Sequence, residues 1–325
     1  MPFSHKIFIG LVLVMVFASN GYSNKGKITY DYPSPQVVSY VHVTGNRIID
    51  PAGNPLFLKI GVWVNLNEGS VTGENYVNFL NYAKAIGINC VLLKANMWLV
   101  KDDGWTRDQR AIDIVHWGIK QANKRGIYVI LNMFDVWSRG KGGKKYNIDS
   151  TQHPINVWKK GHTAAAVHFT KMITREFIKY PMVLFELGNE MEHRPHGSDW
   201  KTFYWMAKNH LLPTFYAIAG KDRPIGVSEQ NLWSLPVNMI FNHNPNRIKR
   251  VKLGDRPIVT NELANGSQLW RDNYIRSSDH SKKYIAAFSQ AKSKGHSGVA
   301  AASGLNINTP INKTAKLVLS KLGEL

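Results

Sequence analysis

The sequence alternates short apolar runs with amphipathic stretches, and this regularity constrains the fold more than any other feature. Eight apolar runs predict strands, at residues 58–64, 88–95, 127–134, 182–190, 223–229, 237–243, 257–262 and 297–306. The stretches that predict helices lie at residues 74–86, 108–125, 158–179, 199–219, 279–294 and 310–322. The segments after the fifth and sixth strands are short or irregular. Gly87, Gly126 and Gly295 each follow a helical pattern and precede a strand, as expected for a helix-to-strand turn.

Strands that are apolar along nearly their whole length, each followed by a helix, indicate a parallel sheet that is covered on its faces. Eight such units favour an α/β fold with a single closed (β/α)8 TIM barrel. An open doubly wound sheet more often has a glycine-rich phosphate turn after its first strand, whereas Val64 is followed by Asn-Leu-Asn-Glu-Gly. Residues 41–50 and 55–58 flank a Pro-Ala-Gly-Asn turn and predict a short hairpin. We expect one barrel domain over residues 41–325, which is a usual length for this fold.

The first 20 residues have the pattern of a secretory signal peptide. Lys6 precedes an apolar segment at residues 7–17, which ends in small and polar residues. The segment is shorter than the roughly 20 apolar residues that a spanning helix needs. An uncleaved N-terminal anchor is the alternative. We expect a signal peptide at residues 1–20, an N-terminal extension at residues 21–40, and a secreted or periplasmic protein with no membrane span after cleavage.

The chain is strongly basic, with 41 Lys and Arg against 22 Asp and Glu and a formal charge of +19. Lys6 is the only charged residue among residues 1–20, so the mature chain keeps +18. Such a surplus of positive charge indicates what the protein binds rather than how it folds. A nucleic-acid binder is one alternative, but the basic residues are spread out, with small clusters at 141–145 and 247–252, and no nucleic-acid motif is present. We therefore expect no nucleic acid as a partner.

The single cysteine and the histidines argue against a disulfide framework and a metal site. Cys90 has no cysteine partner in the chain and lies in an apolar run, so we interpret it as buried packing. His193, His196 and His243 have no spacing that matches a recognised ligand pair. The sequence predicts neither a metal nor a cofactor.

Two of the predicted strands end in a carboxylate. The fourth strand reads Val-Leu-Phe-Glu-Leu-Gly-Asn-Glu and ends at Glu190, and the seventh reads Pro-Ile-Val-Thr-Asn-Glu and ends at Glu262. Glutamates at the carboxyl ends of two barrel strands can face each other, which is the arrangement that glycosidic-bond hydrolysis requires. Glu229 ends the fifth strand and is a lower-ranked candidate for the pair. Glu186 lies deeper in its strand, and we interpret it as a hydrogen-bonded structural group.

With these residues the sequence resembles the clan A retaining glycoside hydrolases, most nearly the cellulase-like family five or a near relative. The resemblance covers residues 41–325 and is carried by short segments, namely GNRIIDPAGNPLFLKIGVWVN, GIN, GIYVIL, LFELGNE and RPIVTNE. It implies that Glu190 is the acid/base, that Glu262 is the nucleophile, and that Asn189 donates a hydrogen bond to the sugar 2-hydroxyl.

Several positions depart from the cellulase-like pattern. Lys94 stands where the second strand often carries an arginine; it keeps the charge but not the bidentate guanidinium. The third strand lacks the common histidine, and the sixth keeps His243 without the tyrosine that usually follows. The eighth strand has no tryptophan and runs to Asn306. We assign Lys94, His243 and Asn306 to substrate binding and expect a subsite unlike that of an ordinary cellulase.

Four tryptophans lie at or just beyond predicted strand ends: Trp63, Trp98, Trp137 and Trp233. Sugar rings stack on aromatic planes, so these positions suit a carbohydrate groove, with core packing as the alternative for any one of them. The glycine- and lysine-rich loop at residues 139–145 follows the third strand and is expected to border the same end of the barrel.

Together these features predict a secreted, endo-acting retaining glycosidase that acts as a monomer on a polysaccharide or an oligosaccharide. The surplus of positive charge suggests that the polysaccharide, or the matrix that holds it, is anionic. The alternative is a non-catalytic carbohydrate-binding barrel derived from such an enzyme, which the missing arginine and the missing tryptophan of the eighth strand motivate.

Overall fold

The structure is a computed structural model. It describes residues 40–66, 71–95, 99–101, 103–135, 155–189, 191, 200–228, 230–242, 256–260, 278–301, 307, 311 and 313–325. The chain divides into two compact units, Met1–Asp31 and Tyr32–Leu325. Every described residue belongs to the second unit. The signal peptide predicted at residues 1–20 lies outside the described residues, as does the extension at 21–40 except for Tyr40.

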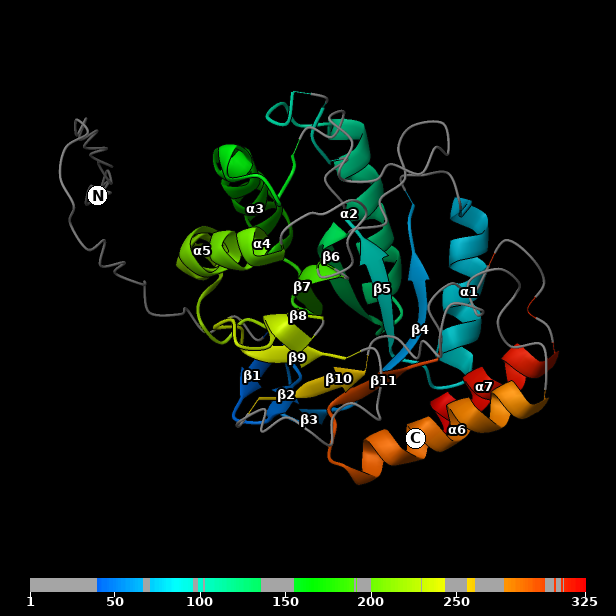
Figure 1. Cartoon of the computed structure of the whole chain (residues 1–325). Coiled ribbons are helices and arrows are strands. Elements are labelled where there is room, and N and C mark those ends of the chain that lie inside the picture. Colours follow the sequence, from blue (N-terminus) through cyan, green and yellow to red (C-terminus); the bar gives the residue numbers. More distant parts are fainter. Residues whose placement is uncertain are drawn as a thin grey trace, which may run out of the picture. The chain divides into compact units, whose positions relative to one another are not determined.

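Eight parallel strands close into a barrel (Figure 1). They are β4 (Leu58–Val64), β5 (Cys90–Lys94), β6 (Tyr128–Asp135), β7 (Val183–Asn189), β8 (Ile225–Val227), β9 (Met239–Phe241), β10 (Ile258–Thr260) and β11 (Gly298–Ala300). Each strand pairs with the next along the chain, and β11 pairs with β4 to close the sheet. The predicted (β/α)8 barrel and all eight of its strands are therefore confirmed.

Helices cover the outside of the barrel. They are α1 (Gly73–Ala85), α2 (Gln109–Asn123), α3 (Thr163–Phe177), α4 (Trp200–Met206), α5 (Leu212–Ala219), α6 (Ser278–Ser293) and α7 (Lys313–Gly323). Short 3-10 turns occupy Lys160–His162, just before α3, and Gln230–Leu232, after β8. The predicted C-terminal glycines are confirmed, because Gly87, Gly126 and Gly295 have φ of +83°, +75° and +72°, a region that glycine adopts without steric strain.

Local sequence explains where two helices begin and why one is irregular. The Thr72 side chain accepts the Asn75 N–H before α1, and the Asp108 side chain accepts the Ala111 N–H before α2. The single helix predicted at residues 199–219 is interrupted by a π-helical turn at Ala207–Leu211. Pro213 follows this turn. Because proline has no N–H, it cannot donate the backbone hydrogen bond of a regular α-helix, and the wider π-helical turn accommodates this interruption.

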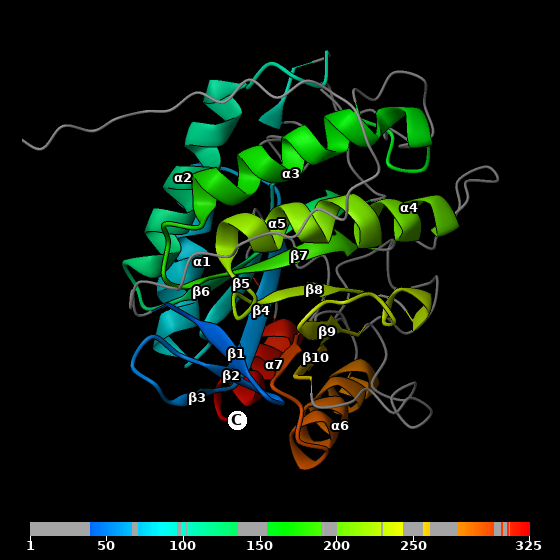
Figure 2. The same ribbon diagram turned by 90° about the vertical axis from the view of Figure 1, so that its left-hand side faces the viewer.

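A small antiparallel sheet closes the amino-terminal end of the barrel. It consists of β1 (His42–Thr44), β2 (Arg47–Ile49) and β3 (Pro55–Leu56), so the predicted hairpin is present and residues 41–50 contain a second turn at Gly45. The Val41 N–H donates to Pro181 O, just before β7, and the Val43 N–H donates to Asp222 O, just before β8. The carboxyl ends of the strands lie at the opposite end (Figure 2).

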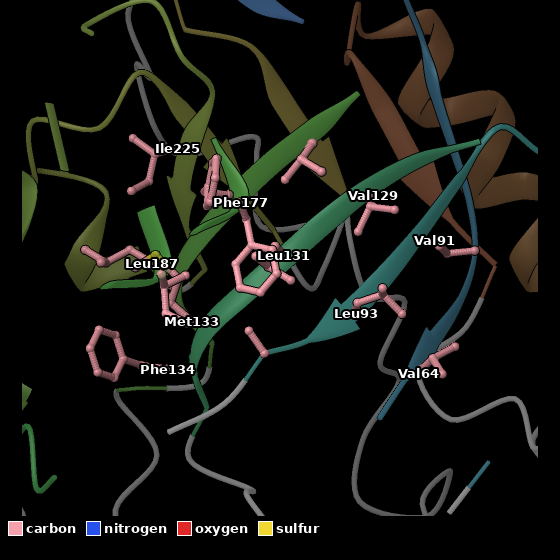
Figure 3. Close-up of a cluster of buried hydrophobic side chains, with 14 of the residues drawn as sticks. Val64, Val91, Leu93, Val129, Leu131, Met133, Phe134, Phe177, Leu187 and Ile225 are labelled. Atoms are coloured by element: carbon pink, nitrogen blue, oxygen red, sulfur yellow. The ribbon is translucent and has the colours of Figure 1, made fainter. Parts of the chain in front are cut away.

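Apolar side chains pack against both faces of the barrel sheet. One cluster lies between strands and helices, and Figure 3 shows members such as Val91, Leu93 and Leu131. A second cluster lies inside the barrel and includes Cys90, Leu92 and other side chains that alternate with the first set along the strands. Cys90 is buried there, as its apolar context predicted. Among the described residues, no helix has the length and apolarity needed to cross a membrane.

Candidate active site

Buried polar side chains gather towards the carboxyl ends of the barrel strands. They are Asn65, Asn132, Asp135, Glu186, Asn189, Ser228 and Asn242. Asp135 and Asn189 are the last residues of β6 and β7, whereas Asn65, Ser228 and Asn242 directly follow β4, β8 and β9. Because the strands are parallel, their carboxyl ends meet at one end of the barrel, where TIM-barrel enzymes build their active sites. A buried polar group is costly unless it is hydrogen-bonded, so the contacts of these side chains define the site.

The lowest polar layer is a carboxylate held by an amide. Asn132 and Glu186 are direct neighbours in the pairing of β6 with β7, and both side chains are buried. Asn132 Nδ2 donates to Glu186 Oε2 at 2.9 Å. The interpretation of Glu186 as a hydrogen-bonded interior carboxylate is confirmed.

The next layer is an ion pair between β5 and β6. Lys94 Nζ lies 2.5 Å from Asp135 Oδ2, and the two side chains are 18% and 0% exposed. The same ammonium lies 5.4 Å from the centroid of the Trp63 ring, which is half-buried near the end of β4. Lys94 and Trp63, both predicted substrate contacts, are therefore side by side at the carboxyl end of the barrel.

Sequence reasoning missed Asp135. The predicted third strand ends at Phe134 and therefore leaves out Asp135. The signal was present, because Asp135 directly follows an apolar run at the position where the other barrel strands end in polar residues. A carboxylate partner is also what a lysine with only 18% of its side chain exposed requires.

Asn189 is fixed at the end of β7 by the neighbouring strand. Its side chain is 2% exposed, and its Oδ1 lies 3.2 Å from Ser228 Oγ, which also lies 3.1 Å from Gly188 O. The hydrogen bond turns the carbonyl side of the amide towards β8 and leaves Nδ2 as the donor side. Gly188 is required before it, since a Cβ there would lie 2.7 Å from Met191 Cγ and 2.8 Å from Phe203 Cζ.

Trp233 does not match the prediction that it presents its ring to a sugar. Its side chain is 4% exposed, and its Nε1 donates to Phe241 O at 3.1 Å. The indole is instead part of the apolar cluster between strands and helices, where its one polar group is satisfied by the end of β9. The alternative interpretation, core packing, holds for this tryptophan.

The remaining predicted site residues lie outside the described residues: Glu190, Glu262, His243, Trp98, Trp137, Asn306 and the lower-ranked Glu229. Glu190 directly follows Asn189 in the sequence, and Glu262 lies two positions after Thr260, the last residue of β10. Their assignment stays a prediction. Among the side chains that the structure does describe, no group of three or more His, Cys, Asp or Glu is arranged to hold a metal ion.

Comparisons with known proteins identify the fold and the family. Among solved structures, an endo-1,4-beta-mannanase from Rhizomucor miehei superposes with a TM-score of 0.62, at 12% identity over 88% of this chain and 99% of its own. A beta-mannanase from the blue mussel Mytilus edulis gives a TM-score of 0.61, at 13% identity over 89% of this chain and 97% of its own. At these identities the similarity shows the fold alone.

Sequence similarity goes further. An endoglucanase from Paenibacillus polymyxa is 24% identical over 278 residues, which cover 74% of this chain and 65% of the endoglucanase. The sequence model of the family described as Cellulase (glycosyl hydrolase family 5) matches residues 54–256, from the turn before β3 to the residues before β10. The resemblance to family five is thereby confirmed. Since this match covers more than half of the chain, the protein belongs to glycosyl hydrolase family 5.

Proposed function

We propose that the protein is a secreted retaining glycoside hydrolase that cleaves a polysaccharide internally, with Glu190 as the acid/base and Glu262 as the nucleophile. One observation carries the proposal: a family 5 chain has Asn189 buried and hydrogen-bonded at the end of β7, directly before Glu190. Glu262 closely follows β10, whose carboxyl end belongs to the same end of the barrel. The names of the relatives, an endoglucanase and an endo-1,4-beta-mannanase, support internal cleavage of a polysaccharide.

The chemistry needs two carboxyl groups about 5–5.5 Å apart. In the first step the Glu262 carboxylate attacks the anomeric carbon, the glycosidic C–O bond breaks, and Glu190 gives its proton to the departing oxygen. In the second step Glu190 takes a proton from water, the water oxygen attacks the anomeric carbon, and the bond to Glu262 breaks. Two displacements at one carbon retain the anomeric configuration.

The described residues support binding of a sugar beside that pair. Lys94 and Asp135 offer a cation and a carboxylate at the carboxyl end of the barrel, and Trp63 supplies a half-buried aromatic ring next to them. Charged donors and acceptors of this kind recognise hydroxyl groups, and the aromatic ring packs on the apolar face of the sugar. The charge of +19 further supports a substrate that carries acidic groups.

The assignment is tested by isosteric substitution. The unchanged protein is first screened against neutral, uronate-bearing, amino-sugar and sulfated polysaccharides. On the substrate found, Glu190→Gln and Glu262→Gln should each lower turnover by at least about a hundredfold, because each removes a catalytic carboxyl group. Glu324→Gln is the matched control, since Glu324 is an exposed carboxylate that pairs with Lys321 on α7. Thermal unfolding should be similar for all four proteins.

Unchanged turnover in either of the first two variants overturns the assignment. A protein that binds polysaccharide but hydrolyses nothing in the screen supports the non-catalytic barrel instead. The preference for acidic substrates is tested separately, by comparing rates on neutral and acidic polymers at low and high salt. Equal rates without salt dependence contradict that part of the proposal.

A further inference from the structure

The outer surface of α3 carries a row of cations. Lys160, Lys171, Arg175 and Lys179 are exposed, and His168 lies between the first two at helical spacing. Residues three and four apart share one face of a helix, so His168, Lys171 and Arg175 line up on α3. Lys160 lies in the 3-10 turn before α3, and Lys179 lies just after it. The row therefore follows the outside of the barrel along most of one helix.

Two exposed tryptophans contact this row from opposite sides. Trp105, which is 48% exposed, lies just before α2. Its ring centroid is 5.1 Å from that of His168, and its carbonyl accepts the His168 Nε2–H at 3.0 Å. Trp205, which is 37% exposed, lies on α4 with the Lys160 ammonium 5.0 Å from its ring centroid. Figure 2 shows α3, α4 and α5 side by side on one flank of the barrel.

The helix that presents Trp205 adds charge of the same sign. Lys201 and Lys208 lie four residues before and three residues after Trp205, and all three side chains are exposed. Lys201 and Trp205 share one face of α4, since residues four apart meet on a helix surface, and Lys208 lies in the π-helical turn that continues the helix. We call the surface formed by the α3 row, Trp105, Trp205 and these two lysines the α3–α4 face.

Among the described residues, acidic side chains neutralise only part of the α3 row. Among the described residues of α3, α4 and α5, Glu176 is the acidic side chain. It pairs with Arg107 at 2.5 Å, with His116 at 2.7 Å and with Lys179 of the row at 3.4 Å. Lys171 and Arg175 form no ion pair with any described residue.

Asp103 lies two residues before Trp105 and orders the turn that carries it. Asp103 accepts the backbone N–H groups of Trp105 and Thr106 and the Thr106 hydroxyl. The Asp103 carboxylate is thus hydrogen-bonded within its own turn.

We propose that the α3–α4 face is an auxiliary docking site for an acidic polysaccharide on the outer flank of the barrel, formed by side chains other than those proposed for catalysis. The indoles of Trp105 and Trp205 stack on sugar rings, and the exposed cations of the same face bind carboxylate or sulfate groups along the polymer. Single exposed ion pairs are weak, so a row of them is needed to hold a chain. Docking raises the local concentration of substrate at the catalytic end. The inference rests on the proposed function for the choice of a polysaccharide, because single-stranded nucleic acid has similar stacking and charge chemistry.

The test measures binding of the intact protein to defined polymers at low salt, by isothermal titration calorimetry. The probes are polygalacturonate, a neutral β-1,4-mannan of similar length, and single-stranded DNA. The unchanged protein should bind polygalacturonate at least about tenfold more tightly than the mannan, and the affinity should fall steadily with added salt.

Two variants address the two halves of the site. Lys171→Gln with Arg175→Gln removes two cations from the middle of the row, and Trp105→Ala with Trp205→Ala removes the stacking surfaces. Each double variant should weaken polygalacturonate binding about tenfold. The matched control is Lys316→Gln with Lys321→Gln, which removes two exposed cations from α7 and should change binding less than twofold. All variants should cleave a short soluble oligosaccharide at the rate of the unchanged protein.

Three results overturn the inference: no preference for polygalacturonate over mannan, equal losses in the α7 control, or tighter binding of DNA than of polygalacturonate. Failure of the docking site is distinguishable from failure of the proposed function. Glu262→Gln should lose hydrolysis and keep its affinity for polygalacturonate. If the unchanged protein hydrolyses its substrate but does not prefer polygalacturonate, the auxiliary site alone is refuted.

Discussion

A buried histidine outside the barrel wall should make the stability of the protein depend on pH. His296 lies between α6 and β11, is 5% exposed, and its Nδ1 lies 3.3 Å from Thr260 Oγ1. Its Nε2 has no hydrogen-bond partner among the described residues. Burial, and to a lesser degree the nearby Lys294 ammonium, lowers the pKa of His296 to about 4. The folded protein therefore holds this imidazole in its neutral form.

The sign and size of the effect follow from linkage. Between pH 6.5 and pH 4 the unfolded chain binds a proton at His296 and the folded chain does not, so acid favours unfolding. Each pKa unit is worth about 1.4 kcal/mol, so the difference between 6.5 and about 4 corresponds to a loss of up to about 3 kcal/mol. The contribution of neutral His296 to the free energy of unfolding is fully present above pH 6.5 and falls as the pH drops. It is lost below about pH 4.

The assay is urea-induced unfolding at several pH values between 7 and 4.5, for the unchanged protein and for His296→Asn. The variant should be less stable at pH 7 because it loses packing, but its free energy of unfolding should fall less steeply with decreasing pH. The His296 C–H signal, identified by its absence in the variant, should titrate well below pH 6 in NMR spectra. Parallel stability profiles for the two proteins, or a signal that titrates near pH 6.5, would refute the reasoning.

Two further predictions concern packing and the ion pair. Gly298→Ala should lower the free energy of unfolding by about 1–3 kcal/mol, because a Cβ there would lie 2.8 Å from Leu58 O. The control Gly161→Ala has open space for a Cβ and should change the free energy of unfolding by less than about 0.5 kcal/mol. Equal changes for the two variants in denaturant unfolding would contradict this. A double-mutant cycle of Lys94→Met and Asp135→Asn should give a coupling energy of about 1–2 kcal/mol, and a value within error of zero would mean that the 2.5 Å contact does not stabilise the fold.

The barrel could be predicted from the sequence because its signals are local and agree with one another. Apolar runs, such as the one that forms β6, are too continuous for a sheet with a solvent-exposed face. Glycines such as Gly126 mark the helix ends, and the number of units then selects a closed barrel. The sequence also predicts Asn189 at the carboxyl end of its strand, because the apolar run that forms the strand ends there.

The parts that sequence reasoning missed depend on contacts between distant residues. The partnership of Lys94 with Asp135 joins two strands that are 41 positions apart at these residues, and no local pattern encodes it. Trp233 follows a predicted strand just as Trp63 lies near the end of one, yet only Trp233 is turned into the core, where Phe241 O accepts its N–H. Neither outcome is determined by the position of a residue within its own strand or loop.

The central claim, double displacement at Glu262, is tested most directly by trapping the covalent intermediate. An activated 2-deoxy-2-fluoro glycoside of the sugar identified in the screen is incubated with the protein, and the product is mapped by peptide mass spectrometry. The account predicts one glycosyl group per chain, attached to the peptide that contains Glu262, in the unchanged protein and in Glu324→Gln but not in Glu262→Gln. Hydrolysis of the substrate with inversion of the anomeric configuration and no covalent adduct would contradict it.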